Sequence, residues 1–570
     1  MPDITKLYIG SRDTLRDSMQ CISKAGLSGL PSGIALVVSS QGILQGIVTD
    51  GDIRRGLLAG VLLEDSVEKI MTRDPIVFNG RMSYREILAE IPKRIAEKGR
   101  CRGGVVEKVI IVDDQGAVEQ VLDFLQLWRH QMALHRHVTV VGLGYVGLTL
   151  AATMAEAGFQ VTGVEVMDSV RESLLEGKPH FHEIGLEALF RHHLGKNLEI
   201  VPEPPRASEI YIIAVGTPIR ADHSPVLEHL QEAAKQVGEV LSHGDLVVLR
   251  STCPVGTSRN VVLPILEKTS DMRCGRDFYL AFAPERTVEG KALFELRTLP
   301  QIIGGFDRNA LDMATSLFRE LTTQIITVSS LEAAEMVKLV NNSFRDVTFA
   351  FANELATVCE SYNLNTSEVV RAANEGYPRN QVPVASPGVG GPCLIKDPYI
   401  FVEAARMAGI QRSLTLHGRE INEAMPALIV KKIVRHLGQI GKAPERSVFF
   451  FIGFAFKGEP ETSDMRDSTT LEVLNLLKPC SSEVRGYDPV ISSSEIEQLG
   501  VKACTITDGF EGADCAILLN NHRSYAQIDI YTCLAGMNRP ALYVDCWNIF
   551  SPEDVKQIDG ITYLGMGFAV

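Results

Sequence analysis

Several features are absent from this sequence of 570 residues, and each absence excludes a class of protein. No segment approaches the roughly eighteen unbroken apolar residues of a membrane span, and the N-terminus has no apolar signal core, so we expect a soluble protein without a membrane partner. The eleven cysteines show neither regular spacing nor a CxxC pair. This pattern excludes a disulfide framework, gives no reason to expect a metal site, and favours a reducing cytoplasm.

Clustered positive charge is also lacking. The formal net charge is -14, and no lysine-rich or arginine-rich tail reverses it locally. We therefore expect no binding to nucleic acid, and a phosphate-bearing substrate would need a local basic pocket. A chain in which 45% of the residues are hydrophobic can build several cores, and this length predicts three or four domains of roughly 150 residues each.

An internal repeat is present in residues 1–130. Aligning Gly42 with Gly116, an offset of 74 residues, superposes residues 35–42 on 109–116. Each copy is predicted to run strand, turn, strand, helix, which resembles a tandem CBS pair, a module that commonly binds adenine nucleotides. The alternative is a structural or dimerising pair without a ligand. Residues 128–137, which are polar and rich in histidine, are predicted to form a linker.

A nucleotide site is predicted in the first copy only. Thr49, Asp50 and Asp52 precede two arginines there, so a hydroxyl and a carboxylate could hold a ribose and the arginines a phosphate. The second copy has residues 123–126, with the sequence DFLQ, at the equivalent place. At most one nucleotide site is therefore expected.

A complete dinucleotide fingerprint follows the linker. The apolar run 138–141 precedes a GxGxxG motif at 142–147, a helical pattern comes next, and a second strand ends in Glu165. The glycines admit a pyrophosphate to the helix N-terminus, and Glu165 can accept hydrogen bonds from ribose hydroxyls. We predict a Rossmann domain over residues 138–327 that binds NAD in preference to NADP, because the carboxylate would repel a 2′-phosphate.

Two threonines follow further predicted strands of this domain, at the sheet edge where ligands lie. The cofactor contacts predicted here are Gly142, Gly144, Tyr145, Val146, Gly147, Glu165, Thr217 and Thr252.

One cysteine stands behind a run of glycines and ahead of a Lys-Asp pair, in the segment 386–398. Glycines let the backbone approach a ligand closely, and a nearby cation lowers the pKa of a thiol. Cys393 is therefore a predicted nucleophile and Asp397 a predicted proton handler. The alternative is a glycine turn that contains a buried cysteine.

A central helical domain is predicted over residues 328–435. A capping box at 329–332 opens a long helix on which Lys338 and Asn342 stand four residues apart and share a face. A cation beside an amide donor suits an oxyanion developing on carbon. A second α/β domain is predicted over residues 436–570, because the buried-strand pattern at 448–452 again leads into a loop and a helix.

Together these residues resemble the UDP-glucose/GDP-mannose dehydrogenase family, which oxidises the C6 alcohol of a sugar nucleotide to a carboxylate. The resemblance spans about residues 138–560 and also includes the segment 284–290. It implies an α/β fold in which two Rossmann-like doubly wound domains are joined by a central helical dimerisation domain. The second Rossmann-like domain would hold the UDP moiety, and the CBS pair would precede both.

The resemblance also implies a mechanism with two hydride transfers to two successive NAD molecules. Cys393 would capture the C6 aldehyde as a thiohemiacetal, which the second transfer converts to a thioester. Asp397 and Thr252 would position the hydrolytic water, while Lys338 and Asn342 stabilise the oxyanion. Glu289 is the predicted acid-base group, with a surface charge as the alternative.

The resemblance assigns further residues to ligands. Arg466 would reach across the cleft to the cofactor, and Arg379 could reach the substrate of a neighbouring subunit. The predicted substrate contacts are Glu285, Arg286, Lys338, Asn342, Arg345, Arg379, Gly390 and Lys457.

The sequence leaves the sugar open. Residues 342–354 resemble most the branch that acts on UDP-N-acetylmannosamine or UDP-N-acetylglucosamine, whereas Pro392 stands where relatives often carry Ser or His. UDP-glucose is the alternative substrate. Two other functions are the alternatives: a hydroxyacid dehydrogenase, which has no use for Cys393, and a non-catalytic nucleotide-sensing protein. The joint presence of Cys393, Lys338, Asn342 and Asp397 argues against the second.

Overall fold

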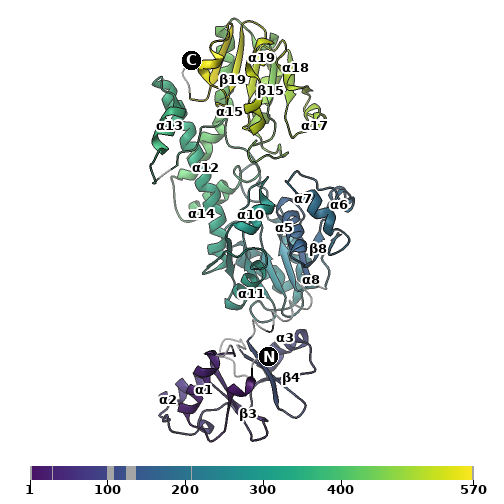
Figure 1. The fold of residues 1–570 in the computed structure, drawn as a ribbon, viewed down its shortest axis with the longest axis vertical. Coiled ribbons are helices and arrows are strands. Elements are labelled where there is room, and N and C mark those ends of the chain that lie inside the picture. The colour runs from purple at the N-terminus through teal and green to yellow at the C-terminus, as the bar shows by residue number, and fades with distance from the viewer. Residues whose placement is uncertain are drawn as a thin grey trace.

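The computed structural model describes residues 3–27, 30–98, 108–123, 127, 137–206, 208–379 and 381–567. Figure 1 shows an elongated chain with the N-terminal unit at one end, an α/β body in the middle beside the central helices, and a second α/β body at the other end. Among the described residues, no helix is both long enough and apolar enough to cross a membrane.

The N-terminal unit is built from two similar halves. Each forms a three-stranded sheet in which a parallel pair is followed by an antiparallel pair, ordered β1-β2-β3 and β4-β5-β6. The first half contains η1 (Ile4–Leu7), β1 (Tyr8–Ile9), α1 (Leu15–Leu27), β2 (Ile34–Val38), β3 (Leu44–Thr49), α2 (Asp50–Leu58) and η2 (Val67–Lys69). The second contains β4 (Val77–Asn79), α3 (Tyr84–Lys98), β5 (Lys108–Val112) and β6 (Val118–Asp123).

The offset between the two halves agrees with the predicted repeat. The bounds of β5 and β6 lie 74 residues after those of β2 and β3, and both hairpins carry a bulge at the equivalent place. Each half also begins with a strand and a helix that the predicted pattern did not include. Residues 124–126 of the second copy and 128–136 of the predicted linker lie outside the described residues, and His137 belongs to a strand rather than to a linker.

The middle body is an eight-stranded sheet ordered β14-β13-β12-β11-β10-β7-β8-β9, parallel except between β12 and β13. Its first half contains β7 (His137–Val141), α5 (Tyr145–Glu156), β8 (Gln160–Val164), α6 (Asp168–Leu175), α7 (Leu186–His193), β9 (Leu198–Val201), β10 (Ile210–Ile213) and α8 (Glu228–Val240). It continues with β11 (Leu246–Leu249), η3 (Ser258–Val262), α9 (Leu263–Ser270), β12 (Tyr279–Phe282), α10 (Ala292–Thr298), β13 (Gln301–Gly305), α11 (Arg308–Phe318) and β14 (Ile325–Val328).

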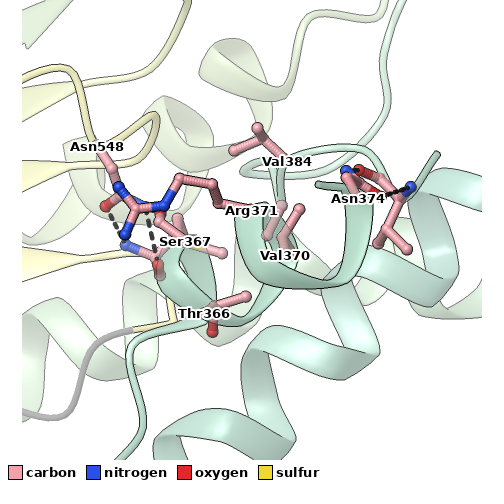
Figure 2. A pocket seen from close by; sticks show the side chains of 10 residues that line it. Thr366, Ser367, Val370, Arg371, Asn374, Val384 and Asn548 are labelled. Atoms are coloured by element: carbon pink, nitrogen blue, oxygen red, sulfur yellow. Dashed lines mark hydrogen bonds between the residues drawn. The ribbon is translucent and has the colours of Figure 1, made fainter. Parts of the chain in front are cut away.

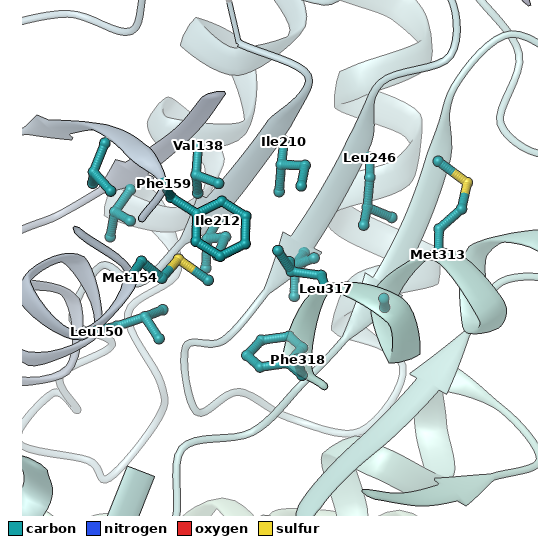
Figure 3. Packing of buried hydrophobic residues seen from close by; sticks show 14 of the residues in the cluster. Val138, Leu150, Met154, Phe159, Ile210, Ile212, Leu246, Met313, Leu317 and Phe318 are labelled. Carbon is teal, nitrogen blue, oxygen red and sulfur yellow. The ribbon is translucent and has the colours of Figure 1, made fainter. Parts of the chain in front are cut away.

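The direction in which successive strands are added reverses between β7 and β10. Ligands of such sheets bind in the crevice at the carboxyl ends of the strands at this point. Figure 3 shows the core behind it, where strand residues meet side chains from α5 and α11, including Val138, Ile210, Ile212, Leu246, Met154, Leu317 and Phe318. Each large apolar side chain buried here contributes about 1.5–3 kcal/mol. The same cluster extends to Leu88 of α3, which lies against Gly244 and so joins the N-terminal unit to the middle body.

Four helices connect the two α/β bodies: α12 (Leu331–Ser361), α13 (Thr366–Asn374), α14 (Asp397–Met407) and α15 (Leu414–Gln439). The predicted capping box is wrong by one residue. Ser330 rather than Ser329 caps α12 by accepting the N–H of Ala333 at 3.1 Å, and Glu332 forms an ion pair with Arg259 at 2.6 Å.

The last body is a fully parallel six-stranded sheet ordered β17-β16-β15-β18-β19-β20. Its elements are η4 (Pro444–Arg446), β15 (Val448–Ile452), α16 (Thr469–Leu477), η5 (Lys478–Cys480), β16 (Glu483–Tyr487), α17 (Ser493–Gln498), β17 (Lys502–Ala503), α18 (Ile506–Phe510), β18 (Cys515–Leu518), η6 (Arg523–Gln527), α19 (Ile530–Ala535), β19 (Ala541–Asp545), α20 (Pro552–Val555) and β20 (Ile561–Gly565). The predicted architecture of two Rossmann-like sheets joined by helices is confirmed.

Candidate functional site

The glycines ahead of Cys393 lie directly on the last α/β body. A Cβ atom at Gly390 would stand 2.3 Å from the carbonyl oxygen of Asp467, and one at Gly391 would stand 2.6 Å from the ring of Phe456. The Gly391 N–H donates to that same Asp467 carbonyl at 3.2 Å, and its φ of +89° favours glycine. The cysteine loop can therefore approach this body only because it lacks side chains at these positions.

The structure brings three predicted catalytic residues together at the start of α14. The buried Asp397 carboxylate accepts from Asn342 Nδ2 at 2.5 Å and from Lys396 Nζ at 2.6 Å. The backbone N–H of Asp397 donates to the Cys393 carbonyl at 3.0 Å. Lys396 was not among the predicted site residues, although its place beside Asp397 in the sequence was a usable signal.

Nearby cations lower the pKa of the Cys393 thiol as expected, but the net shift of that pKa is upward. Cys393 is exposed at the surface, yet enough protein surrounds its sulfur for desolvation to raise the pKa of the thiol above its usual value. Lys338 and Lys396 oppose this rise, while Asp397 adds to it. Because Lys396 is paired with Asp397, its charge is largely balanced, and the thiol needs a base in order to ionise.

The predicted substrate segment, residues 284–290, is held by protein contacts. Glu285 forms a buried ion pair with Arg250 and accepts the N–H groups of Arg286 at 2.7 Å and Thr287 at 2.8 Å. Despite desolvation, these partners hold the pKa of Glu285 below its usual value. Arg286 donates to the Pro300 carbonyl. The predicted substrate contacts at 285 and 286 thus have internal partners, and Arg250 is a buried cation that the sequence analysis missed.

Glu289 lies where the two α/β bodies meet, not on the open surface. Thr462 Oγ1 donates to its carboxylate at 3.3 Å, and Lys457 Nζ donates to its backbone carbonyl at 2.6 Å. Burial, followed by the charge of Asp464, raises the pKa of Glu289 to about 7, against the opposing effects of Lys457 and Arg466. A carboxyl group with a pKa near neutrality can exchange protons with a substrate.

The carboxyl ends of β7, β8 and β10 form the predicted cofactor edge. Gly144 is the N-cap of α5, no side chain caps the helix, and a Cβ at this glycine would meet open space. Free N–H groups at a helix N-terminus suit a pyrophosphate. Glu165 accepts the N–H of Leu143 at 3.3 Å, and Thr217 donates to the Thr252 carbonyl. The described residues therefore fit a dinucleotide.

One tyrosine links the cofactor edge to the substrate segment. Tyr145 donates to Glu183 at 2.5 Å and to the Val288 carbonyl at 3.3 Å, and Glu183 also accepts the N–H of Gly290 at 2.6 Å. Nothing in the sequence pattern pointed to Glu183, because its partners are distant in the chain: Tyr145 is 38 residues away and Gly290 is 107 residues away.

The remaining predicted arginines are not equivalent. Arg466 pairs with Asp464. Its charge opposes the rise in the pKa of Glu289 that burial causes, and it adds to the lowering of the His180 pKa that desolvation causes. Arg345 donates weakly to Asn342 Oδ1 at 3.4 Å. Arg379 is exposed and lies over the ring of Tyr377, with 5.6 Å between guanidinium and centroid.

Thr49 and Asp52 of the predicted nucleotide site are engaged with each other. They form the capping box of α2, in which Thr49 Oγ1 donates to Asp52 Oδ2 at 2.7 Å, and Arg55 pairs with the other Asp52 oxygen at 2.5 Å. The local role as a helix cap explains these residues without a ligand.

The cavity in Figure 2 is separate from the Cys393 surroundings. It has a volume of about 240 Å³ and lies between α13 and the loop that contains Asn548. Its amides are already paired, Asn374 with the backbone of Val382 at 2.9 and 2.8 Å, and Asn548 with the Met566 carbonyl at 3.0 Å. In the described part of the chain, no group of His, Cys, Asp and Glu could hold a metal ion.

One mostly parallel and one fully parallel sheet, a dinucleotide fingerprint on the first, and a thiol at their junction define a dehydrogenase that binds a dinucleotide together with a second ligand. Models of the UDP-glucose/GDP-mannose dehydrogenase family match this chain in their NAD binding domain at 136–322, their central domain at 332–424 and their UDP binding domain at 450–552. The chain belongs to the UDP-glucose/GDP-mannose dehydrogenase family.

Individual relatives agree with the family match. The UDP-N-acetyl-D-mannosamine dehydrogenase of Pyrococcus horikoshii is 32% identical over 434 residues, which cover 75% of this chain and 99% of the relative. The NDP-N-acetyl-D-galactosaminuronic acid dehydrogenase of Ralstonia solanacearum is 31% identical over 401 residues, which cover 69% of this chain and 92% of the relative.

Solved structures give the same result. The structure of the Pyrococcus horikoshii UDP-D-ManNAc dehydrogenase superposes with a TM-score of 0.68 at 30% identity, covering 76% of this chain and 99% of the other. A UDP-glucose dehydrogenase from Pyrobaculum islandicum gives a TM-score of 0.67 at 26% identity, covering 76% of this chain and 98% of the other. The chain is therefore a nucleotide-sugar dehydrogenase with an NAD-binding domain, which excludes both the hydroxyacid dehydrogenase and the non-catalytic binding protein.

With Glu289 in its expected role as the acid-base group, its pKa predicts the pH dependence of the enzyme. The acid is protonated below about pH 7 and cannot then accept a proton, so kcat/KM should fall by about tenfold per unit as the pH drops below this value. Glu289→Gln should remove this limb and lower kcat by about 10²- to 10⁴-fold. Asp464→Asn, the matched control, should move the limb to lower pH, because Asp464 raises the Glu289 pKa.

The measurement is the initial rate of NADH formation across the pH range for all three proteins. A limb near pH 7 that persists in Glu289→Gln would assign this ionisation to another group.

Proposed function

We propose that this enzyme oxidises the C6 alcohol of a UDP-hexose to the uronate in two hydride transfers, with Cys393 as nucleophile. The carrying observation is that Cys393 adjoins the buried Asp397, which Asn342 and Lys396 hold in place. NAD bound at the fingerprint would supply the hydride acceptor for each oxidation, and two NAD molecules would serve in turn. The Cys393 sulfur adds to the C6 aldehyde and gives a thiohemiacetal, from which the second hydride leaves to give a thioester.

Other residues of the protein transfer the proton, stabilise the developing charge, orient the water and bind the UDP moiety. Glu289 accepts the proton of the C6 hydroxyl, which its pKa near neutrality allows. Lys338 and Asn342 stabilise the charge that develops on the C6 oxygen. Asp397, with Thr252 at the cofactor edge, orients the water that cleaves the thioester and regenerates the thiol. Lys457 supplies local positive charge that a UDP moiety needs on a chain of net charge -14, while Arg466 reaches toward the cofactor.

The proposed sugar is UDP-N-acetylmannosamine or UDP-N-acetylglucosamine, and UDP-glucose is the alternative. Several relatives at about 31% identity are named UDP-N-acetyl-D-mannosamine dehydrogenases. The test is NADH formation with each purified UDP-sugar at matched concentrations. Two NADH per sugar consumed, with the highest kcat/KM on one of the two N-acetylated sugars, supports the proposal. A preference for UDP-glucose would assign the enzyme to the alternative.

Cys393→Ser should abolish net turnover and leave NAD binding intact, because the fingerprint lies on a different body from the cysteine loop. A serine oxygen is a poorer nucleophile, and any adduct it forms hydrolyses slowly. Calorimetry measures NAD binding and the NADH assay measures turnover. Cys480→Ser is the matched control and should behave as the wild type. Near-normal turnover in Cys393→Ser would exclude the covalent mechanism.

We propose that the N-terminal unit is a tandem CBS pair that binds an adenine nucleotide. Its two halves have equivalent strand orders and pack on each other, with the Leu44 N–H donating to the Gly116 carbonyl at 3.0 Å. The contact of Leu88 with Gly244 offers a route by which a ligand could change the dehydrogenase. Because Thr49 and Asp52 cap α2, Asp50 is the residue whose removal tests binding most cleanly.

A nucleotide should change dehydrogenase activity or assembly by a modest amount, since coupling free energies of about 1–3 kcal/mol already alter affinity several-fold to a hundredfold. AMP, ADP and ATP are titrated into the wild type and Asp50→Ala, with binding followed by calorimetry and activity by NADH formation. Asp65→Ala, an acid of the same unit outside the proposed site, is the control. No binding by any of the three nucleotides would leave this unit a structural or dimerising pair.

We also propose a homodimer formed along α12. Phe344, Phe351 and Val358 recur at intervals of seven residues on this helix and are 70%, 55% and 47% exposed. An apolar helical stripe with heptad spacing is typical of a surface that pairs with another helix.

Phe344→Glu should convert the dimer to a monomer, because a charge would be buried at the most exposed side chain of the stripe. Light scattering at several protein concentrations measures the mass. Phe294→Glu is the matched control, since Phe294 is 67% exposed on α10, away from the stripe. A wild-type protein that is monomeric at all concentrations would contradict the proposal.

A further inference from the structure

The cysteine loop is held from behind by one buried arginine. Arg419 of α15 is 1% exposed, and its guanidinium donates to Asp346 Oδ1 at 2.7 Å. It also donates to the carbonyl of Leu394 at 3.0 Å and to that of Val389 at 3.0 Å. These two carbonyls lie on either side of Cys393 in the sequence, so one side chain contacts both arms of the loop.

A second set of hydrogen bonds connects this arginine to the start of the loop. Asn422 Nδ2 donates to Asp346 Oδ1 at 2.9 Å, and Asn353 Nδ2 donates to Asn422 Oδ1 at 3.0 Å. Asn353 Oδ1 accepts the N–H of Ser386 at 2.8 Å, and Ser386 Oγ donates to the Gly388 carbonyl at 2.8 Å. We name this buried set the loop clamp, which consists of Asp346, Asn353, Ser386, Arg419 and Asn422.

The chemistry of the side chain explains why an arginine is needed. A guanidinium presents five donors in a rigid planar fork, so it can bind a carboxylate and two carbonyls at once, whereas the ammonium group of lysine is a single point. A buried ion pair is weak evidence for added stability, because desolvation offsets most of the attraction. The contacts to two loop carbonyls therefore suggest a function beyond stability.

The glycines of the cysteine loop explain why the loop has to be held in place. Gly388 and Gly391 have φ of +127° and +89°, and glycines of this kind give the backbone the greatest conformational freedom. A nucleophile on such a segment reacts efficiently only if its position is fixed, since a displacement of about 1 Å can reduce a rate by about a hundredfold.

We propose that Arg419, held by Asp346, is a positioning residue that fixes Cys393 for attack on the C6 aldehyde. This inference rests on the proposed role of Cys393 as nucleophile. Arg419 does not touch the reacting atoms; it acts through the carbonyls of Val389 and Leu394. Losing either contact allows the loop to move while the substrate and cofactor surfaces stay intact.

The test compares full-length variants of the loop clamp that keep its charge balance with a control outside the clamp. Arg419→Lys retains the pairing with Asp346 but cannot contact both carbonyls, and Ser386→Ala removes only the bond to Gly388. The matched control is Lys432→Gln, because Lys432 pairs with Glu360 at 2.6 Å between the same two helices, α15 and α12, and does not touch the loop. Thermal unfolding and NAD affinity establish that each variant is folded.

Arg419→Lys should lower kcat by about ten- to a hundredfold and leave the NAD affinity within about twofold of the wild type. Alkylation of Cys393 by iodoacetamide is followed across pH by mass spectrometry of the Cys393 peptide. In Arg419→Lys, either the alkylation rate should change several-fold or the pH midpoint of alkylation should shift. Ser386→Ala should change both quantities in the same direction by a smaller factor. Lys432→Gln should alter the unfolding temperature alone.

The outcomes separate this inference from the proposed function. Wild-type kcat and alkylation in folded Arg419→Lys and Ser386→Ala would overturn the positioning role, even if Cys393→Ser is inactive. If Arg419→Lys does not fold, Ser386→Ala alone decides, and wild-type behaviour of that variant overturns the role as well. Full turnover in Cys393→Ser would instead refute the nucleophile, while the alkylation profile would still show whether the clamp controls the loop.

Discussion

The contact between the glycine loop and the backbone around Asp467 fixes the geometry of the whole site. A side chain at Gly390 or Gly391 would push the central helices away from the last α/β body. Because the loop carries Cys393 and leads directly into α14, this one contact places the thiol, Asp397 and the C-terminal sheet relative to each other. The conformational freedom that makes the contact possible also makes the loop flexible, and the loop clamp restricts that flexibility.

The charges at the junction of the two α/β bodies nearly cancel. The chain is acidic overall, yet the cations it places at the junction lie among carboxylates that nearly balance them. Lys396 is paired with Asp397, and Arg466 with Asp464, so neither contributes a full free charge. Desolvation therefore dominates the pKa values of both Cys393 and Glu289. The site tunes its acids and bases by burial more than by a simple excess of positive charge.

The N-terminal unit stands apart from this arrangement. The family matches begin at residue 136, after the two repeated halves. The packing of Leu88 on Gly244 nevertheless makes the unit part of the same buried cluster as the NAD-binding sheet. The N-terminal unit and the body that holds the dinucleotide fingerprint therefore share one hydrophobic core.

The sequence by itself determined the local features: the repeat, many of the strands and helices, the fingerprint glycines and the placement of Lys338 and Asn342 on one helical face. These follow from periodicity and backbone conformation, which act over a few residues. It could not give the direction of the pKa shift of Cys393, the true cap of α12, the ion pair of Glu285 with Arg250, or the hydrogen bonds from Arg419 to the cysteine loop. Each of these depends on burial and on partners distant in the chain, and only the tertiary structure brings those groups into contact.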